Sequence, residues 1–368
     1  MATVYIHIGA PKTATSTLQH VLASNYRRLL EKGVLYPQDV RQGDAHHVLV
    51  CDLIEKHQGI HMPEVWYGGQ PRGQAWKNLQ NEIARHGGKI ESVVLSSELF
   101  FGQSKRIKLM LDEIAEHLSG HDIRIIAYLR RQDELYSSFF NQDIKGLRQW
   151  PHSAYQFYET HQIFQFDYFR FLKIWSDAFG APSVMVRPYE PSQWVGGDIV
   201  QDFCVQIGVK GLGAGSAEHN ESLGPNQLYI KRCLNRVGYE KALNDEVLGL
   251  VLRLCREKPV KNTIYVRRNL YRKYRRQWLN VNERLSSEFL QGRALFDQPI
   301  PTADQTIPYF VDHDRVFDFL QNMTASLAHE QYSAHRQLFS RAALLMLTEK
   351  KLWERLDSSA REQLLKWV

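Results

Sequence analysis

Residues 7–17 read His7-Ile8-Gly9-Ala10-Pro11-Lys12-Thr13-Ala14-Thr15-Ser16-Thr17, and this stretch decides how the 368-residue chain is interpreted. It follows a short apolar run at 4–6 that is typical of a buried strand, and it precedes leucines and valines at helical spacing. Such a strand, loop and helix direct backbone N–H groups and the positive end of a helix dipole toward one point, beside a lysine. The stretch therefore predicts a binding site for phosphate or a related anion.

The loop differs from the Walker A motif of P-loop kinases and NTPases. That motif, G-x-x-x-x-G-K-[ST], places a glycine immediately before the lysine. Here Pro11 precedes Lys12, and three residues separate Gly9 from Thr13. A standard P-loop NTPase is therefore disfavoured. A loop of this kind can also open a helix for local reasons, because Ser and Thr are common helix N-caps.

Apolar runs and helical patterns alternate along the first part of the chain. Buried strands are predicted at 4–8, 92–96, 124–129 and 184–186, and helices at 106–118, 134–147, 168–179 and 199–207. This alternation predicts an α/β fold, with a P-loop-like central parallel sheet flanked by helices. Ligands of such sheets bind at the carboxyl ends of the strands. From about residue 226 onward the pattern is largely helical.

We expect an α/β domain over residues 1–300 and a helical C-terminal extension over 301–368. Residues 38–88 are rich in His, Gly, Gln and Pro, and we expect them to form loops and short helices on the substrate side. No run of about 18 apolar residues is present, so no membrane span is predicted. The four cysteines lack CxxC spacing, which favours free thiols in a cytoplasmic protein over disulfides or a zinc site. The oligomeric state is left open.

The net charge of +6 permits anionic partners, and much of it is local. Residues 265–276 contain six Lys or Arg among twelve residues, interleaved with tyrosines. A solvated helix face accounts for this pattern, and so does a contact with an anionic ligand or acidic glycan. Nucleic acid is disfavoured, because no zinc-finger, RNP or basic-zipper pattern accompanies the segment.

A second set of anion-binding residues follows the predicted strand at 124–129. Arg130 lies at the end of this strand, and Ser138 lies eight positions later, within the next helix. The planar guanidinium of an arginine donates two parallel hydrogen bonds to an oxyanion. Alone, the Arg130-Arg131 pair is more typical of surface ion pairs. Together with the first loop it predicts a ligand that has two anionic ends.

These two motifs resemble those of the sulfotransferases that use 3′-phosphoadenosine-5′-phosphosulfate (PAPS). In that family a strand is followed by a G-x-P-K-[TS]-G-T-[TS] loop that holds the 5′-phosphosulfate, matched here by Gly9, Pro11, Lys12, Thr13, Thr15 and Ser16. An arginine at a strand end and a serine eight residues later hold the 3′-phosphate, matched by Arg130 and Ser138. Weaker similarities at 168–180, 186–190 and 198–203 extend the resemblance over about residues 1–210.

Two departures from the family pattern stand out. Ala14 replaces the usual glycine of the loop, which we expect to be harmless because an alanine with a negative φ fits there. The R-K-G-x-x-G-D-W segment of animal cytosolic sulfotransferases is missing, so the residues that contact adenine are not located. The pattern is closer to bacterial and carbohydrate-type sulfotransferases.

The resemblance implies transfer of a sulfuryl group from PAPS to a hydroxyl or amine, with adenosine 3′,5′-bisphosphate (PAP) as product. The acceptor is expected to be a saccharide or another polar alcohol. The backbone of residues 12–16 and the hydroxyls of Thr13, Ser16 and Thr17 would hold the 5′ end, while Lys12 would stabilise the leaving group. A sulfuryl group carries less charge than a phosphoryl group, so no metal is expected.

An acceptor hydroxyl requires a general base. Glu98, at the end of the strand at 92–96, is the first candidate, and a role in capping the following helix is an equal alternative. His47, or its neighbour His46, is the second candidate.

Two other function classes are also compatible with the sequence. One is an atypical P-loop-like kinase, which would need magnesium and ATP. The other is a non-catalytic protein that binds anions or glycans.

Overall fold

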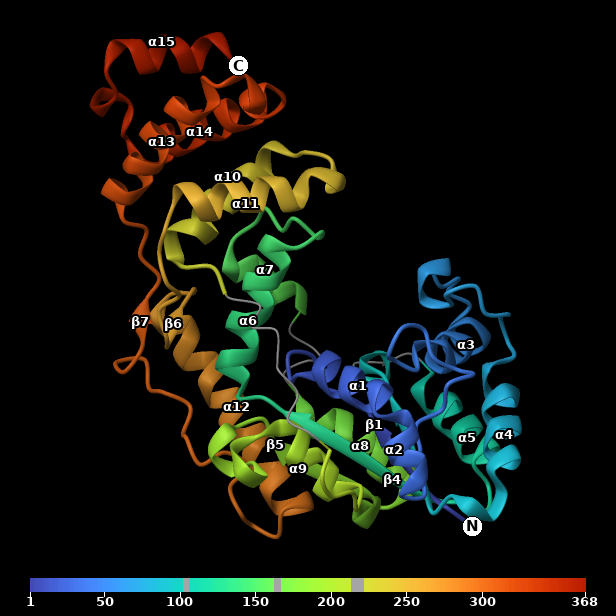
Figure 1. The fold of residues 1–368 in the computed structure, drawn as a ribbon. Helices are drawn as coiled ribbons and strands as arrows, with labels where there is room; N and C mark the ends of the chain where they lie inside the picture. Colours follow the sequence, from blue (N-terminus) through green and yellow to red (C-terminus); the bar gives the residue numbers. More distant parts are fainter. Residues whose placement is uncertain (102–105, 162–166, 213–221) are drawn as a thin grey trace. The chain divides into compact units, whose positions relative to one another are not determined.

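The computed structural model describes residues 1–101, 106–161, 167–212 and 222–368 (Figure 1). It confirms the predicted α/β class, with a central parallel sheet flanked by helices and a helical C-terminal part. The chain forms two compact units that interleave in sequence. The first unit comprises Met1–Leu135, His161–His219 and Arg275–Ile300, and the second comprises Tyr136–Thr160, Asn220–Tyr274 and Pro301–Val368. The division into domains at residue 300 stays a prediction.

Within the described residues, five strands of the first unit form one parallel sheet, in the order β2-β3-β1-β4-β5. These strands are β1 (Thr3–His7), β2 (Val34–Leu35), β3 (Ser92–Ser96), β4 (Asp122–Leu129) and β5 (Val184–Pro188). The four predicted strands correspond to β1, β3, β4 and β5. Strand β2 was not predicted, because two residues are too few to show a periodic pattern.

The helices that belong to the first unit wholly or in part are α1 (Thr15–Ser24), α2 (Tyr26–Glu31), α3 (His47–Gln58), α4 (Ala75–His86), α5 (Ile107–His117), α6 (Gln132–Lys145), α8 (Tyr168–Phe179), α9 (Ile199–Gln206) and α12 (Arg268–Phe289). The four helices predicted at 106–118, 134–147, 168–179 and 199–207 correspond to α5, α6, α8 and α9. Segment 38–88, expected as loops and short helices, is more regular than predicted. It contains α3 and α4, which have 12 residues each.

Both faces of the sheet are covered, which explains the continuous apolar runs of its strands. Helices α1 and α9 pack over Val94, Ile126 and Tyr128 on one face. Side chains alternate along a strand, so Ile125, Ala127 and Leu129 of β4 are buried on the opposite face of the sheet. Helix α8 packs against β4 and β5, and it also contacts α5.

The strand order creates a switch point at the carboxyl end of β1. From β1 the chain builds β2 and β3 on one side of it and then β4 and β5 on the other. Ligands of open α/β sheets bind in the crevice at such a point. The loops that follow β1, β3 and β4 carry most of the predicted site residues, and they lie at this edge.

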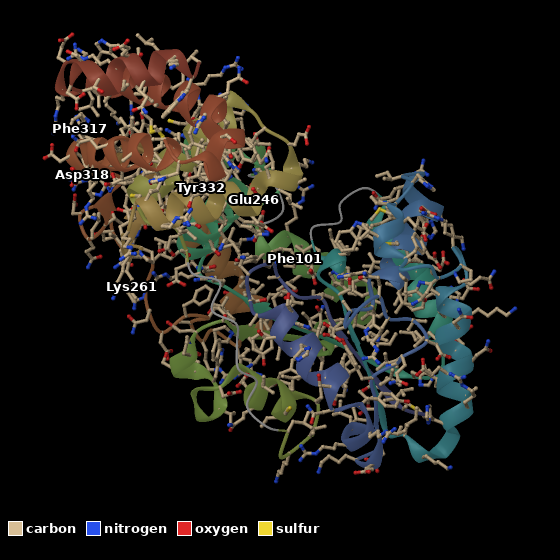
Figure 2. All side chains as sticks on the ribbon, turned by 45° about the horizontal axis from the view of Figure 1, so that its top comes forward. Phe101, Glu246, Lys261, Phe317, Asp318 and Tyr332 are labelled. Atoms are coloured by element: carbon tan, nitrogen blue, oxygen red, sulfur yellow. The ribbon has the colours of Figure 1, made fainter. Side chains whose placement is uncertain are left out.

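The second unit has its own helical core. Its helices include α7 (Ala154–His161), α10 (Pro225–Val237), α11 (Asn244–Leu254), α13 (His313–Leu327), α14 (Arg336–Lys350) and α15 (Ser358–Lys366). Helices α10, α11, α13 and α14 supply most of the buried apolar residues, against which Phe317 and Tyr332 pack as partly buried side chains (Figure 2). The short strands β6 (Thr263–Ile264) and β7 (Ile307–Pro308) pair in parallel.

A buried lysine holds several elements of the second unit together. Lys231 Nζ donates to the carbonyl of Ile144 at 3.1 Å, to Asn235 Oδ1 at 2.7 Å, to the Tyr239 hydroxyl at 2.5 Å and to Asn244 Oδ1 at 3.1 Å. All four acceptors are uncharged. Burial lowers the pKa of Lys231 to about 7.

Candidate functional site

The loop between β1 and α1 has an unusual backbone. Gly9, Lys12 and Ala14 have positive φ angles of 35°, 67° and 57°. Left-handed residues that alternate with ordinary ones turn successive N–H groups toward one side, which produces a concave anion site. For a residue other than glycine this conformation costs about 1–2 kcal/mol. Strain concentrated in one short loop is typical of a functional site.

The conformation of Ala14 corrects one expectation. We expected a negative φ at this position, but the observed angles are φ 57° and ψ 28°. The residue that replaces the glycine of the sulfotransferase pattern therefore has the conformation that glycine favours. Gly9 meets a separate constraint, because a Cβ atom there would lie 3.0 Å from the side chain of Thr15.

Helix α1 begins without a side-chain cap. Its N-cap residue, Ala14, supplies no capping hydrogen bond, and the first N–H groups of a helix have no acceptor within the helix. Thr15 Oγ1 is buried and, among the described residues, has no hydrogen-bond partner. These groups can serve an external acceptor such as a phosphate oxygen. Thr13 differs, because its hydroxyl donates to the carbonyl of Ala10 within the loop.

Arg130, at the end of β4, contacts this loop. Its Nη1 donates to the carbonyl of Lys12 at 3.4 Å, and its Nε donates to Glu134 at 3.2 Å. The guanidinium lies 5.6 Å from the ring centre of Tyr189, and the hydroxyl of Tyr168 donates to the Arg130 carbonyl. The side chain of Arg130 is 27% exposed, so it can still meet a ligand. The structure thus brings the predicted arginine and the predicted loop together.

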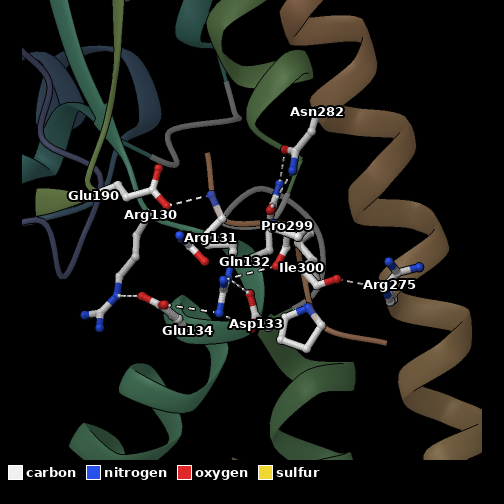
Figure 3. A network of polar contacts seen from close by, with 12 residues as sticks. Arg130, Arg131, Gln132, Asp133, Glu134, Glu190, Arg275, Asn282, Pro299 and Ile300 are labelled. Atoms are coloured by element: carbon white, nitrogen blue, oxygen red, sulfur yellow. Dashed lines mark hydrogen bonds and ion pairs between the residues drawn. The ribbon is translucent and has the colours of Figure 1, made fainter. Parts of the chain in front are cut away.

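The neighbouring Arg131 is committed to the fold (Figure 3). Its Nε and Nη2 bind both oxygens of Asp133 at 2.8 and 3.0 Å, and its Nη1 donates to the carbonyl of Pro299 at 3.2 Å. Burial raises the pKa of Asp133, an effect that Arg131 opposes. Arg131 therefore anchors the segment near Pro299, whereas Arg130 contacts the loop.

Glu98 follows β3 and is hydrogen-bonded to helix α1. Gln19 Nε2 donates to Glu98 Oε2 at 3.3 Å and to Ser96 Oγ at 3.2 Å. Ser96 Oγ also lies 2.9 Å from Nδ1 of His7, the last residue of β1. Burial lowers the pKa of His7 to about 3, so its ring is neutral. These contacts connect the candidate base to β1 and α1, which flank the loop at residues 8–14.

The two histidines at the start of α3 have different surroundings. His46 is fully buried, its Nδ1 accepts from the N–H of Ser96 at 3.0 Å, and its Nε2 donates to the carbonyl of Pro37 at 2.9 Å. Burial lowers the pKa of His46 to about 3. Both ring nitrogens are engaged within the fold, which leaves neither for proton transfer.

His47 lies beside Glu98. Its Nε2 is 4.0 Å from Glu98 Oε1, its Nδ1 is 2.9 Å from Ser97 Oγ, and the ring packs edge-to-face against Trp66. Burial lowers the pKa of His47, and the Glu98 carboxylate opposes that effect. A neutral imidazole and a carboxylate that is 35% exposed therefore lie next to each other at the ligand edge. Imidazoles and carboxylates are both side chains that serve as general bases.

The remaining predicted residues are placed as follows. Ser16 is exposed and Thr17 is half-buried in the first turn of α1, while Pro11 is half-buried in the loop. Ser138 is half-buried in α6, in the part of this helix that belongs to the second unit. Its role beside Arg130 stays a prediction.

Sequence reasoning missed three residues of the site. Gln19 could have been predicted from the sequence. It is a polar residue among the apolar residues of α1, and it lies one turn after Thr15, on the same side of the helix. Trp66 and Tyr189 carried none, since their contacts with His47 and Arg130 depend on how loops fold in space.

Three other features of the described residues bear on the chemistry of the site. No three His, Cys, Asp or Glu side chains there are arranged to hold a metal ion. No helix in the same part of the chain is long and apolar enough to cross a membrane. The four cysteines are buried and free.

Comparison with known proteins does not assign a family. No family model matches the chain, and no solved structure matches it. An uncharacterized protein of Archaeoglobus fulgidus is 26% identical over 234 residues, which cover 61% of this chain and 60% of that relative. The chain thus matches less than two thirds of the relative's length. The function of this chain therefore has to be argued from its own site.

Proposed function

We propose that the chain is a sulfotransferase that moves the sulfuryl group of PAPS to a hydroxyl or amine of an acceptor. The observation that supports this most is the 3.4 Å contact between Arg130 and the carbonyl of Lys12. It brings a guanidinium to a loop whose N–H groups would bind the anion. Two anion-binding groups at one sheet edge suit a nucleotide that has phosphate on both its 3′ and 5′ sides.

The residues present fit such a ligand. The buried hydroxyl of Thr15, which has no partner among the described residues, and the N–H groups of residues 12–16 would hold the 5′ side. Arg130 would donate two parallel hydrogen bonds to the 3′-phosphate. When bound, PAPS supplies an activated sulfuryl group on a phosphate leaving group.

Lys12 and Glu98 would divide the chemistry between them. Lys12 would stabilise the charge that develops on the bridging oxygen as the bond between this oxygen and sulfur breaks. Glu98, with His47 beside it, would take the proton of the acceptor, whose oxygen or nitrogen then forms the new bond to sulfur. Gln19 would fix one carboxylate oxygen of Glu98, leaving the other toward His47.

The acceptor we propose is a saccharide or another polar alcohol, as in the bacterial and carbohydrate-type sulfotransferases that the sequence resembles. We place the reaction in the cytoplasm. The four free, buried cysteines support this, because free thiols suit a reducing compartment.

A thermal-shift experiment tests the nucleotide class. PAP in EDTA should raise the Tm of the full-length chain, whereas ATP with magnesium should not. At a concentration of about 100 times the Kd, the expected stabilisation is about 2.7 kcal/mol. A shift with ATP and magnesium alone would replace this proposal with a kinase-like function.

The catalytic role of Lys12 is tested by release of PAP from PAPS in the presence of a saccharide panel. Lys12→Ala should abolish most of the release, and Lys32→Ala, which changes an exposed lysine of the same unit, should leave it unchanged. Equal rates in the two variants would contradict the role.

A further inference from the structure

Ser97 precedes one candidate base in the sequence and contacts the other. It follows β3 and is fully buried, and its Oγ accepts a hydrogen bond from the N–H of Leu99 at 3.2 Å. The same oxygen lies 2.9 Å from Nδ1 of His47, whose other ring nitrogen, Nε2, lies 4.0 Å from Glu98 Oε1. The ring nitrogen that carries the hydrogen therefore decides whether His47 presents a donor or an acceptor to Glu98.

The hydroxyl hydrogen of Ser97 determines which nitrogen this is. A serine hydroxyl has one hydrogen to donate, and Leu99 already donates to a lone pair of Oγ. Among the residues that the structure describes, Nδ1 of His47 is the only acceptor within hydrogen-bond distance of this hydroxyl. A buried donor without an acceptor costs free energy, so Ser97 donates to Nδ1. In the neutral imidazole the ring hydrogen then lies on Nε2.

The carboxylate of Glu98 favours the same form of the ring. A hydrogen on Nε2 directs the positive end of the N–H dipole toward Oε1, whereas a lone pair there would face a negative charge. At 4.0 Å the two atoms are too far apart for a hydrogen bond, so the N–H attracts the carboxylate electrostatically. The ring of His47 packs edge-to-face against Trp66, and this contact holds its orientation.

We propose that Ser97 fixes His47 as a donor toward Glu98, which makes His47 a positioning residue and Glu98 the base. This inference rests on the proposed sulfuryl transfer. Nδ1 accepts from Ser97 and Nε2 carries the ring hydrogen, so neither nitrogen has a free lone pair for the substrate. Glu98 is 35% exposed and His47 is 8% exposed, so a substrate also reaches the carboxylate more readily.

The transfer balances with Glu98 as the only proton acceptor. The proton of the substrate O–H or N–H moves to a carboxylate lone pair of Glu98, and the substrate oxygen or nitrogen forms the new bond to sulfur. The bond between sulfur and the bridging oxygen breaks, and the oxygen keeps its electron pair. His47 keeps its hydrogen throughout.

Nitrogen NMR of the full-length chain tests the form of the ring without any turnover. The chain has 15 histidines, and the signals of His47 are those that disappear in His47→Gln. At neutral pH its Nε2 should show the chemical shift of a protonated nitrogen and its Nδ1 that of an unprotonated one. Ser97→Ala should shift the Nδ1 signal, whereas Ser24→Ala, which removes an exposed hydroxyl of the same unit, should not. A protonated Nδ1 in the wild type would overturn the proposal.

Rates of PAP release from PAPS distinguish the base from the positioning residue. Glu98→Gln should lower the rate about 100- to 10,000-fold, the usual loss for a general base. His47→Ala should lower it about tenfold. His47→Gln, whose amide N–H can replace the hydrogen on Nε2, should restore most of that loss. Equal losses in His47→Gln and Glu98→Gln would overturn the proposal, because a glutamine cannot act as a base.

Failure of the proposed function would be visible separately. If the wild type releases no PAP with any acceptor, the sulfotransferase activity is wrong, and the NMR signals of the wild type still decide whether Ser97 sets the form of His47. Unchanged thermal unfolding of each variant would show that the lower rates are not due to misfolding.

Discussion

The left-handed conformation of Ala14 predicts that Ala14→Gly stabilises the protein. At φ 57° and ψ 28° the Cβ atom strains the backbone by about 1–2 kcal/mol. Glycine removes this strain, but it also raises the conformational entropy of the unfolded chain, which costs about 0.4–1 kcal/mol. The net expectation is a gain of about 0.5–1 kcal/mol. For most alanines in a helix the same change has the opposite sign.

Urea unfolding of the full-length chain measures this difference. Ala23→Gly serves as the control, because Ala23 lies within α1 and is not among the residues with positive φ. Glycine inside a helix costs about 1 kcal/mol, so the control should unfold at lower urea concentration than the wild type. Ala14→Gly should unfold at the same concentration or higher, with an unchanged slope. If both variants lose stability equally, Ala14 does not have the left-handed conformation, and the backbone described for the loop between β1 and α1 is wrong.

Three other predictions follow from buried polar groups. Arg131→Ala should destabilise the chain by about 3 kcal/mol, because it removes two charge-assisted hydrogen bonds to the Asp133 carboxylate and one to the carbonyl of Pro299, whereas Arg130→Ala should cost less than about 1 kcal/mol; equal urea midpoints would contradict this. The pKa of Lys231 is lowered to about 7, so above that pH the unfolded state binds more protons than the folded state. The free energy of unfolding should therefore rise from about pH 7 toward pH 10, by up to about 1.4 kcal/mol per pH unit. Lys231→Met should remove this rise, and an unchanged pH slope in that variant would show that the lysine is not buried as described. Gln19→Leu should leave PAP affinity in calorimetry unchanged while PAP release from PAPS falls, because it removes a donor to Glu98; a parallel loss of affinity would instead place Gln19 in nucleotide binding.

The strand, loop and helix around Gly9 were predictable because their signals are local. An apolar run, a glycine-containing turn and helical spacing each depend on a few adjacent residues. Arg130 was predictable for a similar reason, since parallel strands end at one edge of the sheet. The sequence also showed that Ala14 stands where a glycine is usual, but not which backbone angle it adopts. That angle depends on how the loop packs. The residues adjacent to Ala14 in the sequence do not indicate this packing.

Roles within pairs of identical residues could not be separated from the sequence. His46 and His47 are adjacent, yet both ring nitrogens of His46 are engaged by the fold, whereas His47 faces Glu98.

Gln19 and Glu98 are far apart along the chain and meet because β3 lies beside β1. Such contacts are decided by the register of the sheet and by helix packing, and a single sequence does not encode them in any short pattern.

The central claim is that the loop and Arg130 together hold a nucleotide with phosphates on both sides of its ribose. Calorimetric titration of PAP and of adenosine 5′-monophosphate, in EDTA, tests it most directly. The wild type should bind PAP about 10- to 100-fold more tightly, since charge-assisted hydrogen bonds contribute about 1.5–3 kcal/mol. In Arg130→Ala this preference should disappear while adenosine 5′-monophosphate still binds. Equal affinity of the wild type for the two nucleotides, with tight binding of ATP and magnesium, would contradict the account.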